Sequence, residues 1–225
     1  MSRRVKIAPS ILSADFCKLA QDIRAIEAAG ADLVHIDVMD GRFVPNITIG
    51  PCVVQSIRPC TKVPFDVHLM IAEPEKYIRD FASAGADIIT IHLEAVDDPL
   101  KGLQEIRGLG KKAGLSINPD TPLSEATPYL DSLDLLLVMS VFPGFAGQRF
   151  MPEALAKMDD ARAQRERLGL SFEIEIDGGI SEKNAGQAAE AGADILVAGS
   201  AVFKSPLGVR GAIDAIRGAA ERHAF

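Results

Sequence analysis

The sequence predicts an α/β protein, a single (β/α)8 barrel (TIM barrel) that spans residues 1–225. Two observations carry this prediction: short apolar, β-rich runs recur eight times along the chain, and helix-like segments separate them. Strands that alternate with amphipathic helices are typical of parallel sheets built from helical crossovers. Eight such units within 225 residues match the usual size of a closed barrel.

The eight predicted strands are runs in which Val, Ile, Leu and Phe dominate. They cover residues 5–12, 33–39, 65–71, 88–94, 115–121, 135–142, 172–179 and 195–203. A doubly wound sheet is the alternative, but it normally carries a glycine-rich dinucleotide-binding turn after its first strand. The chain has APSILSADF at this place, which lacks that pattern and favours the barrel.

Helix-like segments fill the intervals between the strands. Those at 15–30, 73–85 and 153–169 have apolar residues three and four positions apart and end in Gly, which is typical of a left-handed helix C-cap. The tetrapeptide AGAD ends at Asp32, Asp87 and Asp194, each time between a predicted helix and a predicted strand. An ancestral duplication explains this repeat, and so does convergence on a favourable helix-to-strand turn.

Charge and composition argue against several classes of partner. The net charge is −7, with 24 Lys and Arg against 31 Asp and Glu and both signs interspersed. Without a basic stripe, we expect neither a nucleic-acid nor a membrane partner, and no apolar run suits a membrane span or a signal peptide. Cys17, Cys52 and Cys60 lack metal-site spacing, so we expect reduced, buried thiols in a cytoplasmic protein.

Polar side chains interrupt the second and third predicted strands. Because side chains alternate along a strand, His35, Asp37 and Met39 share one face of the second strand. His68 and Met70 share a face of the third strand in the same rhythm. The carboxyl ends of barrel strands are where enzymes of this fold place their chemistry, so we expect a site there.

Asp177, at the end of the seventh strand, completes a set of two imidazoles and two carboxylates. Unpaired carboxylates in a low-dielectric interior would each cost several kcal/mol. His35, Asp37, His68 and Asp177 therefore form a candidate shell for one divalent metal ion. Zinc fits this ligand set, and Mn, Fe and Co fit it too.

The two remaining histidines are not part of this candidate metal site. His92 in the fourth predicted strand is expected to be a core histidine with its hydrogen bonds satisfied, and His223 in the last helix is expected at the surface.

Glycines follow the sixth, seventh and eighth predicted strands, and they allow backbone N–H groups to approach an anion closely. They are Gly144, Gly147, Gly178, Gly179 and Gly199, with Ser200 after the last. Three such turns on one face of a barrel predict a phosphate site.

Five motifs together resemble one family, the ribulose-phosphate 3-epimerases. They are APSILSADF (8–16), HIDVMDGRFVPNITIGP (35–51), DVHLMI (66–71), VMSVFPGFAGQRF (138–150) and DGGI (177–180). The resemblance implies interconversion of the phosphorylated ketopentoses D-ribulose 5-phosphate and D-xylulose 5-phosphate at C3, in the pentose phosphate pathway, the Calvin cycle or both. Barrels of this kind often associate, so a homo-oligomer is expected.

The resemblance also assigns roles within the site. Asp37 and Asp177 would be the acid and base on opposite faces of a planar enediolate, and both would bind the metal ion with His35 and His68. Substrate contacts carried over are Ser10, His68, Gly144, Phe145, Ala146, Gly147, Gly178, Gly179, Gly199 and Ser200. Met39, Met70 and Met139 match methionines that cap the enediolate. The chain departs from the family at Phe142, where Asn or Glu is usual, and at Ala146, where Gly is usual.

Three other functions are compatible with parts of this pattern. A 3-epimerase of a six-carbon ketose phosphate, such as D-allulose 6-phosphate, would need only a different pocket shape. Related decarboxylases and aldolases use a lysine two residues after the strand aspartate, where this chain has Met39. A non-catalytic phosphate-binding barrel would be expected to lose one of the two acid/base carboxylates.

Overall fold

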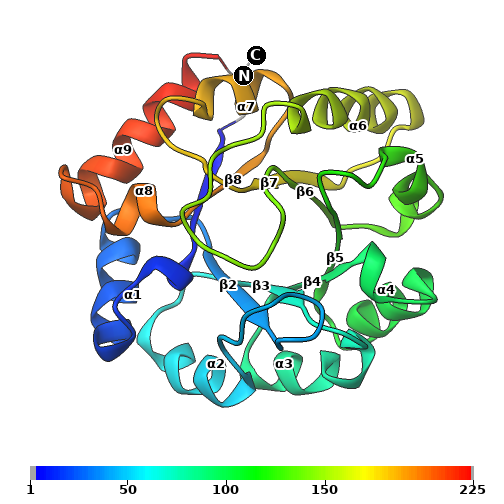
Figure 1. Cartoon of the computed structure of the whole chain (residues 1–225), viewed down its shortest axis with the longest axis horizontal. Helices are drawn as coiled ribbons and strands as arrows, with labels where there is room; N and C mark the ends of the chain where they lie inside the picture. The colour runs from blue at the N-terminus through cyan, green and yellow to red at the C-terminus, as the bar shows by residue number, and fades with distance from the viewer. Residues whose placement is uncertain (1–3, 224–225) are drawn as a thin grey trace.

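The computed structural model describes residues 4–223, and they form eight parallel strands around one axis with helices outside (Figure 1). The strands are β1 (Lys6–Pro9), β2 (Val34–Met39), β3 (Phe65–Met70), β4 (Ile88–His92), β5 (Lys112–Ile117), β6 (Leu135–Met139), β7 (Glu173–Asp177) and β8 (Ile195–Ala198). The helices are α1 (Leu19–Ala28), α2 (Pro51–Ile57), α3 (Ile78–Ala84), α4 (Pro99–Gly108), α5 (Leu123–Ala126), α6 (Ala154–Leu168), α7 (Ala185–Glu190), α8 (Ser200–Phe203) and α9 (Gly208–Glu221). The predicted (β/α)8 barrel is confirmed.

The strands pair in the order β1-β8-β7-β6-β5-β4-β3-β2, with every pair parallel. Between β1 and β2, a single parallel bridge joins Ser10 to His35 within the described residues. The pairing of β1 with β2, which closes the barrel, therefore depends on one bridge between two residues that the sequence predicts in the functional site.

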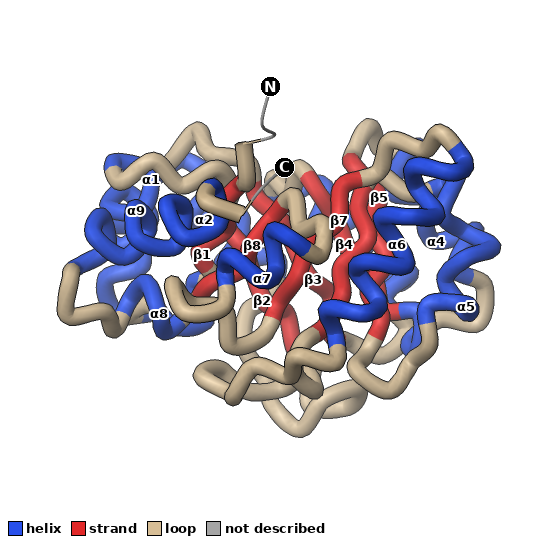
Figure 2. Tube along the Cα trace, turned by 90° about the horizontal axis from the view of Figure 1, so that it is seen from above, coloured by secondary structure: helices blue, strands red, loops and turns tan. Residues whose placement is uncertain are grey.

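The apolar core has two main parts, outside and inside the ring of strands, and a small third cluster of Met39, Val44 and Met70. The larger part packs the outer faces of the strands against the helices and includes Ile36, Val67 and Leu136. The smaller part fills the barrel interior with residues such as Leu137 and Val197. Viewed from the side, the long loops gather at one end of the strands (Figure 2), which is the carboxyl end where β2 and β6 lead into them.

Several predicted strand boundaries are wrong by a few residues. The apolar run 195–203 leaves the sheet at Ala198 and continues as α8, whereas 5–12 leaves it at Pro9 and turns at Ser10. Apolar residues pack equally well from a turn or a short helix, so hydrophobicity alone extended these strands too far. In the opposite direction, β5 begins at Lys112, before the predicted start at residue 115. The prediction missed this beginning because the small residues after Lys112 carry little strand signal.

The cysteine prediction is partly wrong. All three cysteines are free, but Cys17 and Cys52 are exposed and Cys60 is half-buried. Both exposed thiols lie on helical segments of the outer layer, where one face meets solvent. Within residues 4–223, no helix is both long and apolar enough to cross a bilayer.

A repeated aspartate closes the amino-terminal end of the barrel. The last residue of each AGAD segment accepts a hydrogen bond from the amide of a residue in the preceding odd-numbered strand. In the unit before β4, Phe65 N donates to Asp87 Oδ2 (2.7 Å) and Asp87 N donates back to Phe65 O (2.9 Å). The same reciprocal pair joins Asp32 to Ile7, and Asp194 to Ile174.

The fourth copy of this arrangement lies at Asp134, before β6, in a segment that does not read AGAD. Ala113 N donates to Asp134 Oδ2 (2.8 Å), and Asp134 N donates to Ala113 O (2.9 Å). An arginine from the neighbouring helical layer pairs with each of the four carboxylates. The pairs are Arg217–Asp32 (2.6 Å), Arg58–Asp87 (3.0 Å), Arg107–Asp134 (2.9 Å) and Arg165–Asp194 (2.5 Å). We call these four pairs the basal Asp–Arg pairs.

Candidate active site

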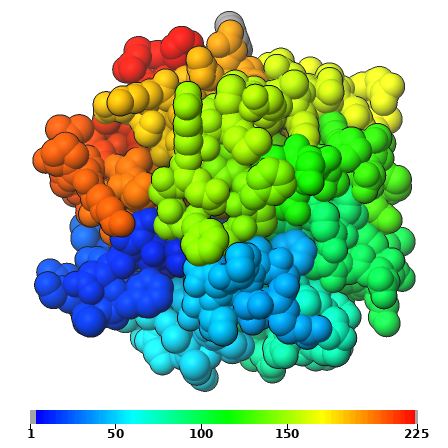
Figure 3. All heavy atoms as spheres, in the orientation of Figure 1, coloured from blue at the N-terminus to red at the C-terminus, as the bar shows by residue number. Residues whose placement is uncertain are grey.

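The candidate site is a cavity at the carboxyl ends of the strands, covered by the segments after β2 and β6. Figure 3 shows these two segments, blue and yellow-green, meeting at the centre of this face. Asn46 in the first segment donates from Nδ2 to the carbonyl of Gly144 in the second (3.0 Å). The loop after β6, which lines the cavity, is therefore held by the segment after β2 from the opposite side of the barrel.

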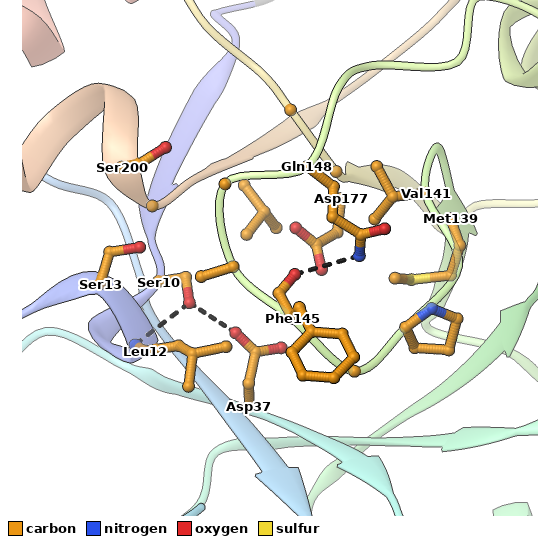
Figure 4. A pocket seen from close by; sticks show the side chains of 18 of the residues that line it. Ser10, Leu12, Ser13, Asp37, Met139, Val141, Phe145, Gln148, Asp177 and Ser200 are labelled. Carbon is orange, nitrogen blue, oxygen red and sulfur yellow. Dashed lines mark hydrogen bonds between the residues drawn. The ribbon is translucent and has the colours of Figure 1, made fainter. Parts of the chain in front are cut away.

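The structure brings together nearly all of the residues that the sequence assigns to the site. The cavity is lined by Ser10, Asp37, Met39, Met70, Met139, Gly144, Phe145, Ala146, Gly147, Asp177, Gly178, Gly179, Gly199 and Ser200. His35 and His68 do not line it, because they lie fully buried below its floor. Figure 4 shows Asp37 and Asp177 pointing into the same cavity from opposite sides.

Four donor groups converge on the cavity floor. One nitrogen or oxygen from each of His35, Asp37, His68 and Asp177 lies within 4.8 Å of the other three. Donors at about 2.0–2.2 Å from one cation are separated by up to twice that distance, so small side-chain rotations suffice. The register of β2 and β3 places two of the four donor residues side by side, because Asp37 pairs directly with His68.

The hydrogen bonds of His35 test whether a metal ion fits this place. Its Nδ1 lies 2.6 Å from Asp66 Oδ2, which holds a proton on that nitrogen. Its Nε2 is fully buried, has no hydrogen-bond partner, and lies 3.3 Å from Asp37 Oδ1. A bare buried nitrogen that faces a carboxylate is unfavourable unless a proton or a metal cation lies between them. The donor set therefore fits a divalent metal ion.

The two acid/base candidates differ in their electrostatic environments. Burial would raise the pKa of Asp37, but the imidazoles of His35 and His68 outweigh burial and hold its pKa far below the ordinary value. Burial, together with the charge of Asp37, raises the pKa of Asp177 from 3.8 to about 7. At a pH at which Asp37 is ionised, Asp177 can therefore hold a proton, as expected for a base and its partner acid.

Ser10 supports the ionised state of Asp37. Its Oγ donates to Asp37 Oδ2 at 2.5 Å, and accepts from the amide of Leu12 (3.3 Å). Figure 4 shows both contacts. This hydroxyl lies at the barrel seam and at the edge of the cavity, where a substrate oxygen can also reach it.

Sequence reasoning missed Asp66 and Glu175, two fully buried carboxylates just below the cavity floor. Asp66 Oδ1 and both oxygens of Glu175 have no hydrogen-bond partner. Burial and the neighbouring Asp66 raise the pKa of Glu175 well above its ordinary value. Strand alternation was the available signal, because Asp66 shares the face of His68, and Glu175 that of Asp177.

The glycine turns bring the backbone close to the cavity. Gly179 has φ +64°, and a Cβ there would lie 2.4 Å from the amide nitrogen of Phe150, so no other residue fits. A Cβ on Gly199 would meet the hydroxyl of Ser13 at 2.7 Å. The turns after β6, β7 and β8 therefore converge at one end of the cavity.

The departures from the family pattern leave this geometry intact. Among the described residues, Glu73 alone has a positive φ without being glycine, so Ala146 adopts a backbone open to any residue. Phe142 is half exposed, and it meets the site only through its carbonyl, which accepts from Gln148 Nε2 (2.7 Å). Gln148 also donates to the carbonyl of Phe145 (3.1 Å) and lines the cavity. Gln148 lies within one of the five family-like motifs, but its sequence context alone predicts no role for it.

Both remaining histidines lie where expected. His223 is exposed. His92 is fully buried, with its two ring nitrogens close to His68 and Glu94.

Fold and site together define a class: (β/α)8-barrel proteins with paired carboxylates, imidazoles that could bind a metal ion, and a cluster of glycine turns at the carboxyl ends of the strands. Comparison with solved structures agrees on the fold. KGPDC from Streptococcus mutans superimposes with a TM-score of 0.74 at 14% identity, over 97% of this chain and 98% of that one. For 3-hexulose-6-phosphate synthase from Salmonella typhimurium the TM-score is 0.68 at 16% identity, with coverage of 97% and 100%.

Sequence comparison is more specific. Residues 6–203 match the model of the ribulose-phosphate 3-epimerase family. Ribulose-phosphate 3-epimerase of Synechocystis sp. is 56% identical over 208 residues, covering 92% of this chain and 90% of that protein. Ribulose-phosphate 3-epimerase of Escherichia coli K12 is 50% identical over 201 residues, 89% of each. The chain belongs to the ribulose-phosphate 3-epimerase family.

Proposed function

We propose that the protein interconverts D-ribulose 5-phosphate and D-xylulose 5-phosphate by inverting C3. The observation that carries this proposal is the pair Asp37 and Asp177, which face one cavity from opposite sides with opposite pKa shifts. Inversion next to a ketone needs a base on one face of the substrate and an acid on the other. The close relatives named ribulose-phosphate 3-epimerase support the same reaction.

In this reaction the carboxylates exchange roles with direction. One ionised carboxylate removes the C3 proton, the substrate becomes a planar enediolate, and the protonated carboxyl returns a proton to the opposite face of C3. The substrate need not move between these steps, because the two groups already flank it. Ser10, hydrogen-bonded to Asp37, keeps that carboxylate oriented and lines the cavity, where a bound substrate would reach it.

His35, Asp37, His68 and Asp177 would hold one divalent cation, with zinc the first choice and Fe, Mn or Co compatible with the donors. When bound, such an ion supplies Lewis-acid stabilisation of negative charge on the substrate oxygens. Because Asp37 and Asp177 also transfer protons, their proton affinities belong to the whole site.

The remaining lining residues suit the two ends of a ketose phosphate. The glycine turns after β6, β7 and β8, with Ser200, present backbone N–H groups for the phosphate. Their members are Gly144, Phe145, Ala146, Gly147, Gly178, Gly179 and Gly199. Met39, Met70 and Met139 line the cavity, where they would cap the reacting carbons and exclude water that competes for protons.

We extend the proposal to the whole chain: residues 1–225 act as one catalytic domain in the cytoplasm, as a homo-oligomer, in the pentose phosphate pathway or the Calvin cycle. The exposed free thiols of Cys17 and Cys52 suit a reducing compartment. Size-exclusion chromatography with light scattering measures the oligomeric state directly.

The test is a substrate panel on the purified protein before and after metal chelation. We expect rapid conversion of ribulose 5-phosphate, slower conversion of D-allulose 6-phosphate, and loss of both activities on chelation with recovery on adding zinc. Equal or faster turnover of the six-carbon substrate would reassign the enzyme to that substrate. Full activity in chelator with no protein-bound metal would refute the metal site.

A further inference from the structure

His92 is a third buried imidazole beside the proposed metal site, and neither metal binding nor proton transfer uses it. Its Nε2 lies 2.8 Å from Nε2 of His68, and the two rings stack with centroids 4.9 Å apart. Its Nδ1 lies 3.1 Å from Glu94 Oε2. His68 in turn presents Nδ1 to Asp37 Oδ1 at 3.3 Å. The two imidazoles therefore form a chain with a carboxylate at each end.

Glu94 is held so that it can only accept hydrogen bonds. Its Oε1 accepts from the amide of Asn118 (2.7 Å) and from the hydroxyl of Thr121. The Nζ of Lys157 donates to the carbonyls of Asn118 (2.8 Å), Pro119 (2.7 Å) and Thr121 (2.6 Å), which fixes the loop that carries both donors. Burial alone would raise the pKa of Glu94, but these donors and His92 outweigh it and lower the pKa to about 2. The outer end of the chain is thus a fixed carboxylate.

Counting protons along the chain identifies one contact that lacks a hydrogen. When both imidazoles are neutral they carry two N–H groups, whereas the chain has three contacts: Glu94 to His92, His92 to His68, and His68 to Asp37. Glu94 requires the first proton on His92 Nδ1. His92 then offers a bare Nε2, which requires the second proton on His68 Nε2. The contact left without a proton joins His68 Nδ1 to Asp37, the two groups proposed as metal ligands.

We propose that Glu94 and His92 are positioning residues that set the tautomer of His68, so that its Nδ1 lone pair faces the metal ion. This inference rests on the proposed metal site. His35 has a simpler version of the same device, in which Asp66 alone holds the Nδ1 proton and leaves Nε2 for the ion. Partners that orient metal-ligand histidines typically contribute about 10- to 100-fold in metal affinity.

Glu94→Gln reverses the hydrogen-bond polarity without changing the shape of the side chain. The amide oxygen must face the two donors from Asn118 and Thr121, so the NH2 group faces His92 Nδ1 and needs an acceptor there. His92 then carries its proton on Nε2 and donates to His68, whose own proton moves to Nδ1 and occupies the metal-facing position. Thr121→Val is the matched control, because it removes one donor but leaves a carboxylate facing His92.

The experiment measures zinc affinity by competition with a chelator, and histidine tautomers by ¹⁵N NMR of the metal-free protein. We expect about 10- to 100-fold weaker zinc binding in E94Q, near-normal binding in T121V, and a His92 proton that moves from Nδ1 in the wild type to Nε2 in E94Q. Zinc affinity within about twofold of wild type in E94Q, or an Nε2–H His92 in the wild type, would overturn the inference. A wild-type protein that binds no zinc would instead refute the proposed metal site itself.

Discussion

The two ends of this barrel treat carboxylates in opposite ways. At the amino-terminal end, Asp32, Asp87, Asp134 and Asp194 each pair with an arginine and accept a strand amide. In the interior toward the carboxyl end, Asp37, Asp66, Glu175 and Asp177 have no lysine or arginine partner in the described part of the chain, and the ion pairs formed there involve only histidine.

This difference indicates that the two sets of carboxylates have different roles, one in stability and the other in chemistry. A carboxylate with a cationic partner and an amide donor has its charge compensated, so it can join strand to helix at little cost. A buried carboxylate without one is costly and tends to protonate or to bind a metal ion. The basal Asp–Arg pairs therefore stabilise the barrel, whereas the interior carboxylates retain unfavourable charge that substrate and metal ion can use.

The largest effect is expected at the interior end. Asp177→Asn keeps the shape of the side chain but removes the proton carrier, so we expect turnover of ribulose 5-phosphate to fall by about 10²- to 10⁴-fold with the fold preserved. The measurement is kcat at saturating zinc, with circular dichroism to check folding. The control is Asp134→Asn, the same change at the basal end, which should leave kcat unaltered. Near-normal turnover in D177N would contradict a two-carboxylate mechanism.

At the basal end, the effect should appear in stability instead of turnover. Arg165 and Asp194 form the most buried of the basal pairs, with side chains 10% and 5% exposed. Asp194→Asn leaves the Arg165 charge without compensation, so we expect a loss of about 3–5 kcal/mol in the free energy of unfolding. Denaturation by urea measures it.

The more exposed pair provides the comparison. Arg107 and Asp134 are 43% and 33% exposed, and Asp134→Asn should cost about 1 kcal/mol or less. Equal losses in the two variants would show that burial of the pair does not set its contribution.

A smaller effect concerns the pH dependence of the metal-free protein. The pKa values of Asp177, Glu175 and His35 are raised in the folded state, so each contributes stability that is lost as pH rises through its folded pKa. The pKa of His68 is lowered to about 4, which acts in the opposite sense, but only below its ordinary value of 6.5. Between pH 6.5 and 8 the raised groups therefore dominate.

Over this pH range we expect the metal-free protein to lose on the order of 1 kcal/mol of unfolding free energy. Thermal or urea unfolding at pH 6.5, 7.2 and 8 provides the measurement, and D177N should show a flatter profile. A stability that rises steadily to pH 8 would mean that the interior charges are compensated after all.

Much of the site could be predicted because its signals are local. Alternation along one strand placed His35, Asp37 and Met39 on a single face, and the glycines after three strands indicated the turns that line the cavity and are proposed to bind phosphate. The barrel itself followed from the repeated strand and helix pattern, which depends on no particular side chain.

The remainder depends on contacts between distant segments. The AGAD repeat was visible, but its meaning was not, because the arginines lie on other elements and the fourth copy at Asp134 has a different sequence. Glu94 and Lys157 are ordinary charged residues in the sequence. Their importance appears only when the loop after β5 folds back onto Glu94, which contacts His92.

The most direct test of the central claim is hydrogen exchange at C3 in deuterated water. Wild-type protein should invert C3 and incorporate solvent deuterium in both epimers. In Asp37→Asn and Asp177→Asn, the remaining carboxylate can still remove and return a proton on its own face. We therefore predict exchange without inversion, with each variant exchanging the opposite epimer. Inversion that persists in either variant, or exchange of the same epimer by both, would contradict an acid/base pair acting from opposite faces.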